Sequence, residues 1–193
     1  FDVVMHTATK YLAGHSDVVA GAVVTDHDRM DRIFYRAFLL NGGILAPWDA
    51  WLTLRGMRTL PTRLREHEAA ALALAETLAQ HPAVAAVHHP ALTADPDLVT
   101  RQMSGHTGVF SFVLADGRWE AVCALVDALE HFRIGVSWGG VDSLVISPQR
   151  PGNERILGDR GLPTGLIRLS IGLEGVDLLR DDLLRALSRL PPR

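Results

Sequence analysis

A polar stretch between two apolar runs near the start of the chain is the strongest constraint on its fold. Residues 1–5 read FDVVM and residues 18–24 read VVAGAVV, both typical of β-strands, and we expect the second strand to be buried. Between them, HTATKYLAGHSD begins with small and hydroxyl-bearing residues and ends in Gly14-His15-Ser16-Asp17, which predicts a tight turn. Lys10 therefore lies just past the end of a strand, where α/β sheets place their ligands.

Lys10 is the only lysine in the sequence, because the other 18 of its 19 Lys and Arg residues are arginines. An arginine stays protonated at working pH, whereas a partly desolvated lysine amine can lose its proton and attack an aldehyde. A Schiff-base role would explain why an amine occurs here; the alternative is a surface lysine with no chemical role. Thr7 and Thr9 could donate hydroxyl hydrogen bonds to a phosphate, or could serve ordinary strand and turn structure.

The rest of the chain alternates helical and strand patterns, which predicts an α/β or α+β fold. A helix over 26–40 should bury one apolar face, and a second helical region opened by Pro47 should run to Gln80 with bends at Gly56 and Pro61. The apolar face of the first helix consists of Met30, Ile33, Phe34, Ala37 and Phe38. We expect further strands at 84–88, 107–114, 133–137 and 166–173, helices at 118–130 and 177–190, a loop at 90–97 and a mobile surface loop at 149–161.

Composition excludes several classes of function. The 193 residues are 48% hydrophobic without an apolar run long enough to span a bilayer, so we expect a soluble protein with no membrane partner. The net charge of −3 comes from interspersed charges, which argues against a nucleic-acid partner. One cysteine, Cys123, cannot form an internal disulfide and fits a reducing compartment, so we expect a cytoplasmic location.

Arg168 is the second residue that we expect to carry chemistry. Apolar residues flank it on both sides in LIRLSI, and a guanidinium in an apolar strand needs a partner such as a carboxylate held through two hydrogen bonds. That carboxylate could belong to a substrate. The alternative is an internal ion pair with an aspartate or glutamate.

Five segments in order resemble one enzyme family. They are HTATKYLAGHSDVVAGAVV at 6–24, the long segment from Leu52 to Leu92, SGHTGVFSFVL at 104–114, VSWGGVDSLVISP at 136–148 and GLIRLSIGLEGVDLLRDDLLRAL at 165–187. Together they resemble the pyridoxal-phosphate (PLP) enzymes of Cys/Met metabolism, or transsulfuration, which include cystathionine β-lyase, cystathionine γ-synthase, cystathionine γ-lyase and methionine γ-lyase. The resemblance implies the C-terminal part of the α/β fold-type-I architecture. Residues 1–47 would end the large PLP-binding domain, and residues 48–193 would form a linking helix and the smaller C-terminal domain.

The resemblance also implies roles for individual residues. Lys10 would form the Schiff base with PLP, Thr7 and Thr9 would help to hold its phosphate, and Arg168 with Ser137 would bind the substrate carboxylate. Trp138 is where this chain most resembles the β-lyases, whereas Asp142 departs from the glutamate usual in the family.

We therefore expect a C–S lyase that acts on cystathionine, cystine or a cysteine conjugate by β-elimination. The alternative is γ-elimination or γ-replacement on a small-molecule sulfur amino acid.

The start of the chain affects these expectations. It begins at Phe1 without a methionine, inside an expected strand, and so resembles the C-terminal half of a longer family member. An alternative of another class is therefore an inactive fragment or the structural half of a split enzyme. We expect association, either as a homotetramer built from two dimers or by pairing with the missing N-terminal half.

Two other motifs do not support a site. Gly135 to Gly139 matches the G-x-S-x-G nucleophile elbow around Ser137, but the elbow needs a helix after the serine and the hydrolase triad needs a later histidine. No helical pattern follows directly, and all nine histidines lie at or before His131. His88 and His89 are adjacent, so on a strand they face opposite sides, and we expect no metal site.

Overall fold

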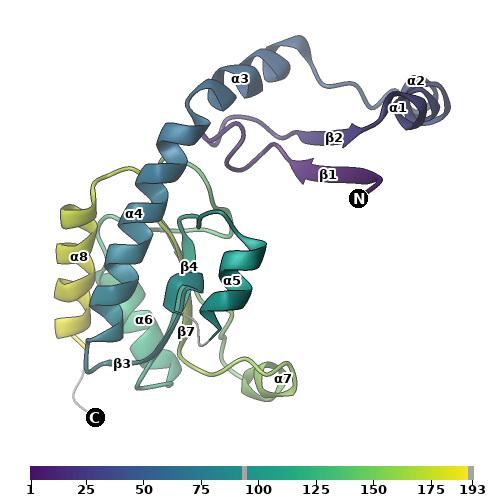
Figure 1. Ribbon diagram of the computed structural model, residues 1–193. Helices are drawn as coiled ribbons and strands as arrows, with labels where there is room; N and C mark the ends of the chain where they lie inside the picture. The colour runs from purple at the N-terminus through teal and green to yellow at the C-terminus, as the bar shows by residue number, and fades with distance from the viewer. Residues whose placement is uncertain (93–94, 191–193) are drawn as a thin grey trace. The chain divides into compact units, whose positions relative to one another are not determined.

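The computed structural model describes residues 1–92 and 95–190 and divides into two compact units (Figure 1). The first unit spans Phe1–Pro61 and the second begins at Thr62. The division falls inside the long helix that starts after Thr59, later in the chain than the domain boundary predicted near Pro47. The assignment of residues 48–61 to the smaller domain of the family fold stays a prediction.

The first unit contains a two-stranded antiparallel sheet followed by helices. Strands β1 (Val3–Thr7) and β2 (Gly21–Thr25) pair from Val3 opposite Thr25 to Thr7 opposite Gly21. The helix predicted over 26–40 is confirmed, with Asp26 as its N-cap and Gly42 in the left-handed region at its C-terminal end. It consists of α1 (His27–Ile33), a π-helical turn η1 (Phe34–Phe38) and α2 (Leu39–Asn41), and α3 (Pro47–Arg58) follows with proline in its first turn.

Two burial predictions for this unit are wrong. The strand predicted over 18–24 begins only at Gly21 and is not buried, because Val23 is 42% and Val24 64% exposed, whereas Val18 before it is buried. The apolar face of the helix is not part of a core either, since none of the residues of α1, η1 and α2 is buried. Both results have one physical reason: β1 and β2 pair only with each other among the described residues, so this unit has too few layers to cover its apolar side chains.

The second unit is built on a five-stranded sheet in the order β3-β4-β7-β6-β5. Its strands are β3 (Val84–His88), β4 (Val109–Leu114), β5 (Arg133–Ile134), β6 (Leu144–Ile146) and β7 (Leu166–Ser170). The pairs are antiparallel except β5 with β6, which is parallel. Each strand predicted for this unit is present, but three are shorter than predicted: β4 begins at Val109 rather than Thr107, β5 ends at Ile134 rather than Ser137, and β7 ends at Ser170 rather than Leu173.

Three helices cover one face of this sheet: α4 (Leu60–Ala79), α6 (Trp119–Ala128) and α8 (Val176–Ser188). Alternate residues of β4 and β7 enter the same core as the leucines of these helices, as expected for period-two strands with one face buried. The strand residues are Phe110, Phe112, Leu114, Ile167 and Leu169, and the helix residues include Leu74, Leu78, Leu125, Leu179 and Leu183. Residues between these strand positions, Arg168 among them, therefore point to the other face.

The helical region predicted from Pro47 to Gln80 forms two helices, α3 and α4, which meet at Thr59 between Gly56 and Pro61. Two predicted loops contain helices. The segment 149–161 includes α7 (Glu154–Asp159). Its first residue, Gln149, is buried, and its side chain bonds to the carbonyl of Gly117 and to the amide of Gly165. The segment 90–97 contains the 3-10 turn η2 (Pro90–Leu92) and the start of α5 (Pro96–Gln102), while residues 93–94 lie outside the described residues.

Candidate active site

Lys10 lies in a closed backbone turn directly after β1. The amide of Ala13 donates to the carbonyl of Ala8 over 2.9 Å, and the amide of Gly14 donates to the carbonyl of Lys10 over 2.8 Å. Ala8 and Ala13 are buried, whereas Lys10 is half-buried. The apolar residues thus anchor the turn and leave its lysine at the edge of solvent, where an amine can reach a ligand.

The two predicted phosphate-binding threonines differ in their surroundings. Thr7 is exposed at the end of β1, and the Thr9 hydroxyl accepts from the amide of Ala20 over 3.0 Å. The same hydroxyl donates to the Ala20 carbonyl over 3.2 Å, which is long for an O–H···O bond. That carbonyl already accepts from the amides of Ala8 and Thr9, at 2.8 and 3.1 Å. The Thr9 proton is therefore weakly held and can rotate toward a stronger acceptor.

Arg168 is the charged residue of β7, on the sheet face opposite the helix-covered core. Its Nη2 donates to the carbonyl of Ser137 over 2.9 Å and to that of Gly135 over 3.5 Å. Its guanidinium carbon lies 5.8 Å from the centre of the Trp138 ring, within cation–π range. Burial lowers the pKa of Arg168 from its usual value, because the surrounding strands remove water from the cation.

One buried nitrogen of this guanidinium has no hydrogen-bond partner among the described residues. Nε of Arg168 is buried and makes no hydrogen bond within the part of the chain that the structure describes. A buried N–H of a cation left without an acceptor is costly, so a site with such a group is suited to an anion that supplies one. A carboxylate meets this need and can bind a guanidinium through two oxygens.

Ser137 and Trp138 lie in the connection between β5 and β6, and both are half-buried. Gly139 follows with φ of 79°, a left-handed conformation that favours glycine, and its amide donates to Ser170 Oγ over 3.3 Å. This turn brings the Ser137 carbonyl and the Trp138 ring to Arg168. The three residues are therefore neighbours in the structure. Their contact with a substrate stays a prediction.

A supporting network beside this group was not predicted from the sequence. The Ser143 hydroxyl donates to Glu174 Oε2 over 2.8 Å and accepts from the Gly172 amide over 2.8 Å. A Cβ on Gly172 would lie 2.3 Å from the Val141 carbonyl, so only glycine permits this close approach. The network joins the end of β7 to the loop before β6. No local pattern in the sequence indicates this network, because Ser143 lies 29 residues before Gly172 and 31 residues before Glu174.

The predicted residues are thus brought together in two groups, one in each unit. Thr7, Thr9 and Lys10 share the strand end and turn of the first unit. Ser137, Trp138 and Arg168 lie together on the face of the second unit's sheet that is opposite the helix-covered core.

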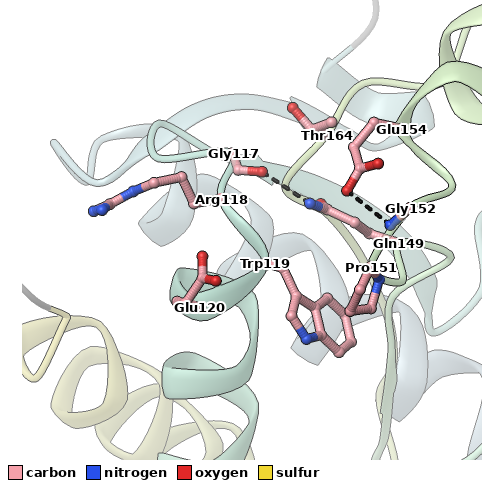
Figure 2. A pocket seen from close by; sticks show the side chains of 9 residues that line it. All are labelled: Gly117, Arg118, Trp119, Glu120, Gln149, Pro151, Gly152, Glu154 and Thr164. Carbon is pink, nitrogen blue, oxygen red and sulfur yellow. Dashed lines mark hydrogen bonds between the residues drawn. The ribbon is translucent and has the colours of Figure 1, made fainter.

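A large hollow in the second unit belongs to neither group. It measures about 620 Å³ and lies between the start of α6 and the segment that leads into α7 (Figure 2). Its one basic side chain, Arg118, is bonded to Asp116, so the hollow offers no cation for a substrate carboxylate. Its lining residues are Gly117, Arg118, Trp119, Glu120, Gln149, Pro151, Gly152, Glu154 and Thr164.

The other sequence motifs also lack the geometry of a site. The chain after Ser137 continues as loop and then β6, so it does not form the strand-to-helix elbow of a serine hydrolase. Residues 1–92 and 95–190 contain no group of three or more His, Cys, Asp or Glu side chains that could bind a metal. Across the same residues, every helix is too short or too polar to cross a bilayer.

Comparison with known proteins shows the family of the chain. A family model described as "Cys/Met metabolism PLP-dependent enzyme" matches residues 1–188. Cystathionine gamma-synthase of Mycobacterium leprae is 41% identical over 97% of this chain and 49% of the relative, and cystathionine beta-lyase of Lactococcus lactis subsp. cremoris is 39% identical over 97% and 50%. The crystal structure of cystathionine gamma synthase from Xanthomonas oryzae pv. oryzae in complex with aminoacrylate and cysteine superimposes with a TM-score of 0.88 at 42% identity, covering 97% of this chain and 50% of that chain.

This chain spans about half the length of the curated relatives that it matches. The match extends across both units, from the strand before Lys10 to the last helix. The α/β fold expected from the resemblance is confirmed by the solved relatives. The chain belongs to the family of PLP-dependent enzymes of Cys/Met metabolism.

Proposed function

We propose that this chain forms the lysine-bearing part of a PLP-dependent lyase that breaks the carbon–sulfur bond of a sulfur amino acid by β-elimination. The observation that carries the proposal is the buried Nε of Arg168, which lacks an acceptor among the described residues and lies beside the Ser137 turn. An amino-acid substrate brings the carboxylate that this nitrogen needs.

The residues present fit PLP. Its aldehyde requires one amine, and Lys10 supplies the only lysine amine in the chain, half-buried in a closed turn. Its phosphate requires hydroxyl donors, and Thr9 has a proton that is weakly held by an already satisfied carbonyl. Thr7 offers a second, exposed hydroxyl at the same strand end. When bound, PLP supplies the electron sink that stabilises negative charge at the substrate Cα.

Each residue of the chain then has a defined task. Arg168 holds the substrate carboxylate through Nε, while its Nη2 stays bonded to Ser137 and fixes the plane of the guanidinium. Trp138 covers one face of that guanidinium and keeps water from it. Lys10 would hold the cofactor through its Nζ, and the same amine would serve as the general base that takes the proton from the substrate Cα. Loss of the proton from Cα allows the bond between Cβ and sulfur to break.

A second candidate is γ-chemistry: γ-elimination or γ-replacement on cystathionine, methionine or an activated homoserine. The observation that favours it is the similarity to the cystathionine gamma-synthases of Mycobacterium leprae and Xanthomonas oryzae at 41% and 42% identity. Trp138 instead favours β-elimination, because it is where the chain most resembles the β-lyases. Product analysis separates the two, because β-elimination of cysteine-like substrates gives pyruvate and γ-elimination gives 2-oxobutyrate.

A third candidate is of another class, in which this chain alone is inactive or is the structural half of a split enzyme. Coverage of about half of each relative supports it. We propose accordingly that the chain works in association, either in a homotetramer of two dimers or with an N-terminal half. We also propose a cytoplasmic location, since one cysteine needs no oxidising compartment.

The experiment that tests the main proposal uses the uniqueness of Lys10. The chain is incubated with PLP, its visible absorption is recorded, and borohydride then fixes the cofactor for mapping by mass spectrometry. We expect one modified residue, Lys10, and none in Lys10→Ala or in the charge-preserving Lys10→Arg. Cofactor fixed equally in the two variants would refute the assignment of Lys10.

Activity assays then separate the candidates. Pyruvate released from cystine by the unsubstituted chain but not by Lys10→Ala supports β-elimination and rules out the inactive fragment. 2-Oxobutyrate as the main product from cystathionine supports γ-chemistry. Cofactor fixed on Lys10 without turnover supports the structural half.

A further inference from the structure

Helix α3 touches the turn that carries Lys10 at one glycine. Gly56 is the buried residue of α3, and a Cβ built on it would lie 2.1 Å from the carbonyl oxygen of Ala13 and 2.8 Å from its carbonyl carbon. Both atoms are backbone, so no side-chain rotation can relieve the overlap. The carbonyl would have to move by about 1 Å to restore an ordinary contact distance. The helix and the turn therefore pack this closely only because residue 56 has no side chain.

The contact point on the turn is directly coupled to Lys10. The Ala13 amide bonds to Ala8, and the Gly14 amide bonds to the carbonyl of Lys10 itself. Ala13 is 1% exposed, so the surrounding protein encloses it. A displacement of the Ala13 peptide thus moves the backbone that bears the lysine.

A second residue holds the same carbonyl from another direction. His15 Nδ1 lies 2.7 Å from the Ala13 oxygen and donates to it. The backbone on both sides of His15 is left-handed, with φ of 74° at Gly14 and 60° at Ser16. The left-handed conformation is unfavourable for serine, and such conformations persist where the surrounding structure requires them. Here the left-handed residues Gly14 and Ser16 turn the backbone so that the imidazole of His15 reaches the carbonyl of Ala13.

We propose that the Ala13 peptide is the support that positions Lys10, held by Gly56 of α3 on one side and by His15 on the other. Gly56 and His15 are positioning residues, since they act on Lys10 through the backbone of Ala13. The inference rests on the proposed function for its catalytic meaning, but the support itself is a property of the folded chain and can be measured without cofactor.

The first test measures hydrogen exchange of the Ala13 and Gly14 amides in the chain without PLP. We expect Gly56→Ala to speed exchange at both amides at least about tenfold, because the shift of Ala13 and its peptide moves the two N–H donors away from the carbonyls of Ala8 and Lys10. Gly158→Ala is the matched control: Gly158 also lies in a helix, α7, and a Cβ there would meet nothing within 4 Å. Unchanged exchange at Ala13 and Gly14 in folded Gly56→Ala would overturn the proposal.

The second test measures cofactor fixation on Lys10 by borohydride under the conditions used for the unsubstituted chain. We expect the fixed fraction to fall in Gly56→Ala and to stay unchanged in Gly158→Ala; in a complete enzyme kcat would fall about a hundredfold, the size expected for a 1 Å misplacement. Equal fixation in Gly56→Ala and the unsubstituted chain would overturn the positioning role. If the unsubstituted chain also fails to fix the cofactor, the proposed function is refuted. The exchange test then still shows whether Gly56 and His15 hold the Ala13 peptide.

If circular dichroism shows that Gly56→Ala does not fold, His15→Ala tests the proposal in its place. His15 is exposed, so its replacement removes the bond to Ala13 without opening the core. We expect faster exchange at Ala13 and Gly14 and a smaller fixed fraction on Lys10. Unchanged exchange and fixation in His15→Ala would contradict the two-sided support.

Discussion

The guanidinium of Arg168 donates a 2.9 Å hydrogen bond to the carbonyl of Ser137, a residue 31 positions earlier in the chain. This bond fixes one edge of the guanidinium and leaves Nε buried without an acceptor among the described residues. The arginine is thus held by the protein on one side and prepared for an anion on another. Preorganisation of this kind allows a carboxylate to bind without the cost of ordering the side chain.

Replacing Arg168 by lysine should preserve charge but remove the planar, two-point geometry. We expect KM for the sulfur amino acid to rise about a hundredfold in the complete enzyme, as the loss of a charge-assisted pair of hydrogen bonds predicts, with a smaller effect on kcat. Steady-state kinetics on cystathionine measure this. Arg133→Lys is the control, because Arg133 is exposed and 3.9 Å from Asp142. An unchanged KM in Arg168→Lys would show that the substrate carboxylate binds elsewhere.

Trp138 contributes through its ring, which lies 5.8 Å from the guanidinium carbon of Arg168. A cation–π contact of about 1 kcal/mol corresponds to a factor of about five in affinity. We therefore expect Trp138→Leu to raise KM about fivefold. Trp119→Leu, at the hollow of Figure 2, removes a half-buried tryptophan elsewhere and should leave KM unchanged. Equal KM values in the two variants would mean that the ring does not support Arg168.

The elements of the second unit could be predicted from the sequence because each carries its own local signal. The leucines of α8 recur at helical spacing, and β4 alternates Phe110 and Phe112 with smaller residues, so one buried face decides each structure. The first unit shows the limit of this reasoning. Phe34 and Phe38 form an apolar stripe that predicts burial, but burial needs a partner surface, and a pattern within one helix cannot show whether the partner is present.

The candidate site divides in the same way. Lys10 and Arg168 stand out because each is chemically unusual in its local sequence: one is the only lysine, and the other is a cation in an apolar strand. Gly56 and Glu174 have no such signal, since their importance arises from contacts with residues distant in the chain. Local patterns identify reactive groups, whereas the residues that support those groups become visible only when the backbone is folded.

Gln149 should be a strong stability determinant although it lies in a segment predicted to be a mobile loop. Its Nε2 donates to the Gly117 carbonyl over 3.0 Å, and its Oε1 accepts from the Gly165 amide over 2.6 Å (Figure 2 shows the first of these bonds). Gln149→Leu would leave both backbone groups without a partner, which should lower the free energy of unfolding by about 3 kcal/mol.

Urea unfolding measures this change. Gln102→Leu, at the exposed end of α5, is the matched control and should change stability by less than about 0.5 kcal/mol. An unfolding free energy for Gln149→Leu equal to that of the control would contradict the structural role.

Acidification should destabilise the second unit through two buried histidines. Burial is the main cause that lowers the pKa of His67 and of His89; Arg63 adds to the effect at His67 and His106 at His89, while nearby Glu174, and Glu68 and Glu76, oppose it. Both groups bind a proton less readily in the folded than in the unfolded chain. As the pH falls below about 6.5, the ordinary histidine value, the unfolded chain takes up protons first and gains relative stability. The stabilising effect of neutral His67 and His89 is therefore complete above that pH and is lost below it.

Urea midpoints at pH 7.5 and pH 5.5 measure the effect, and His89→Gln should make the dependence on pH shallower because one of the two groups no longer titrates. His131→Gln replaces an exposed histidine and should leave the dependence unchanged. Since His89 Nδ1 accepts from the Ala91 amide over 3.1 Å, the proton of the neutral ring is on the buried Nε2, which makes no hydrogen bond among the described residues. Protonation would add a charge to a ring that is already short of acceptors. A urea midpoint that does not fall between pH 7.5 and pH 5.5 would therefore contradict the burial of the His89 ring in solution.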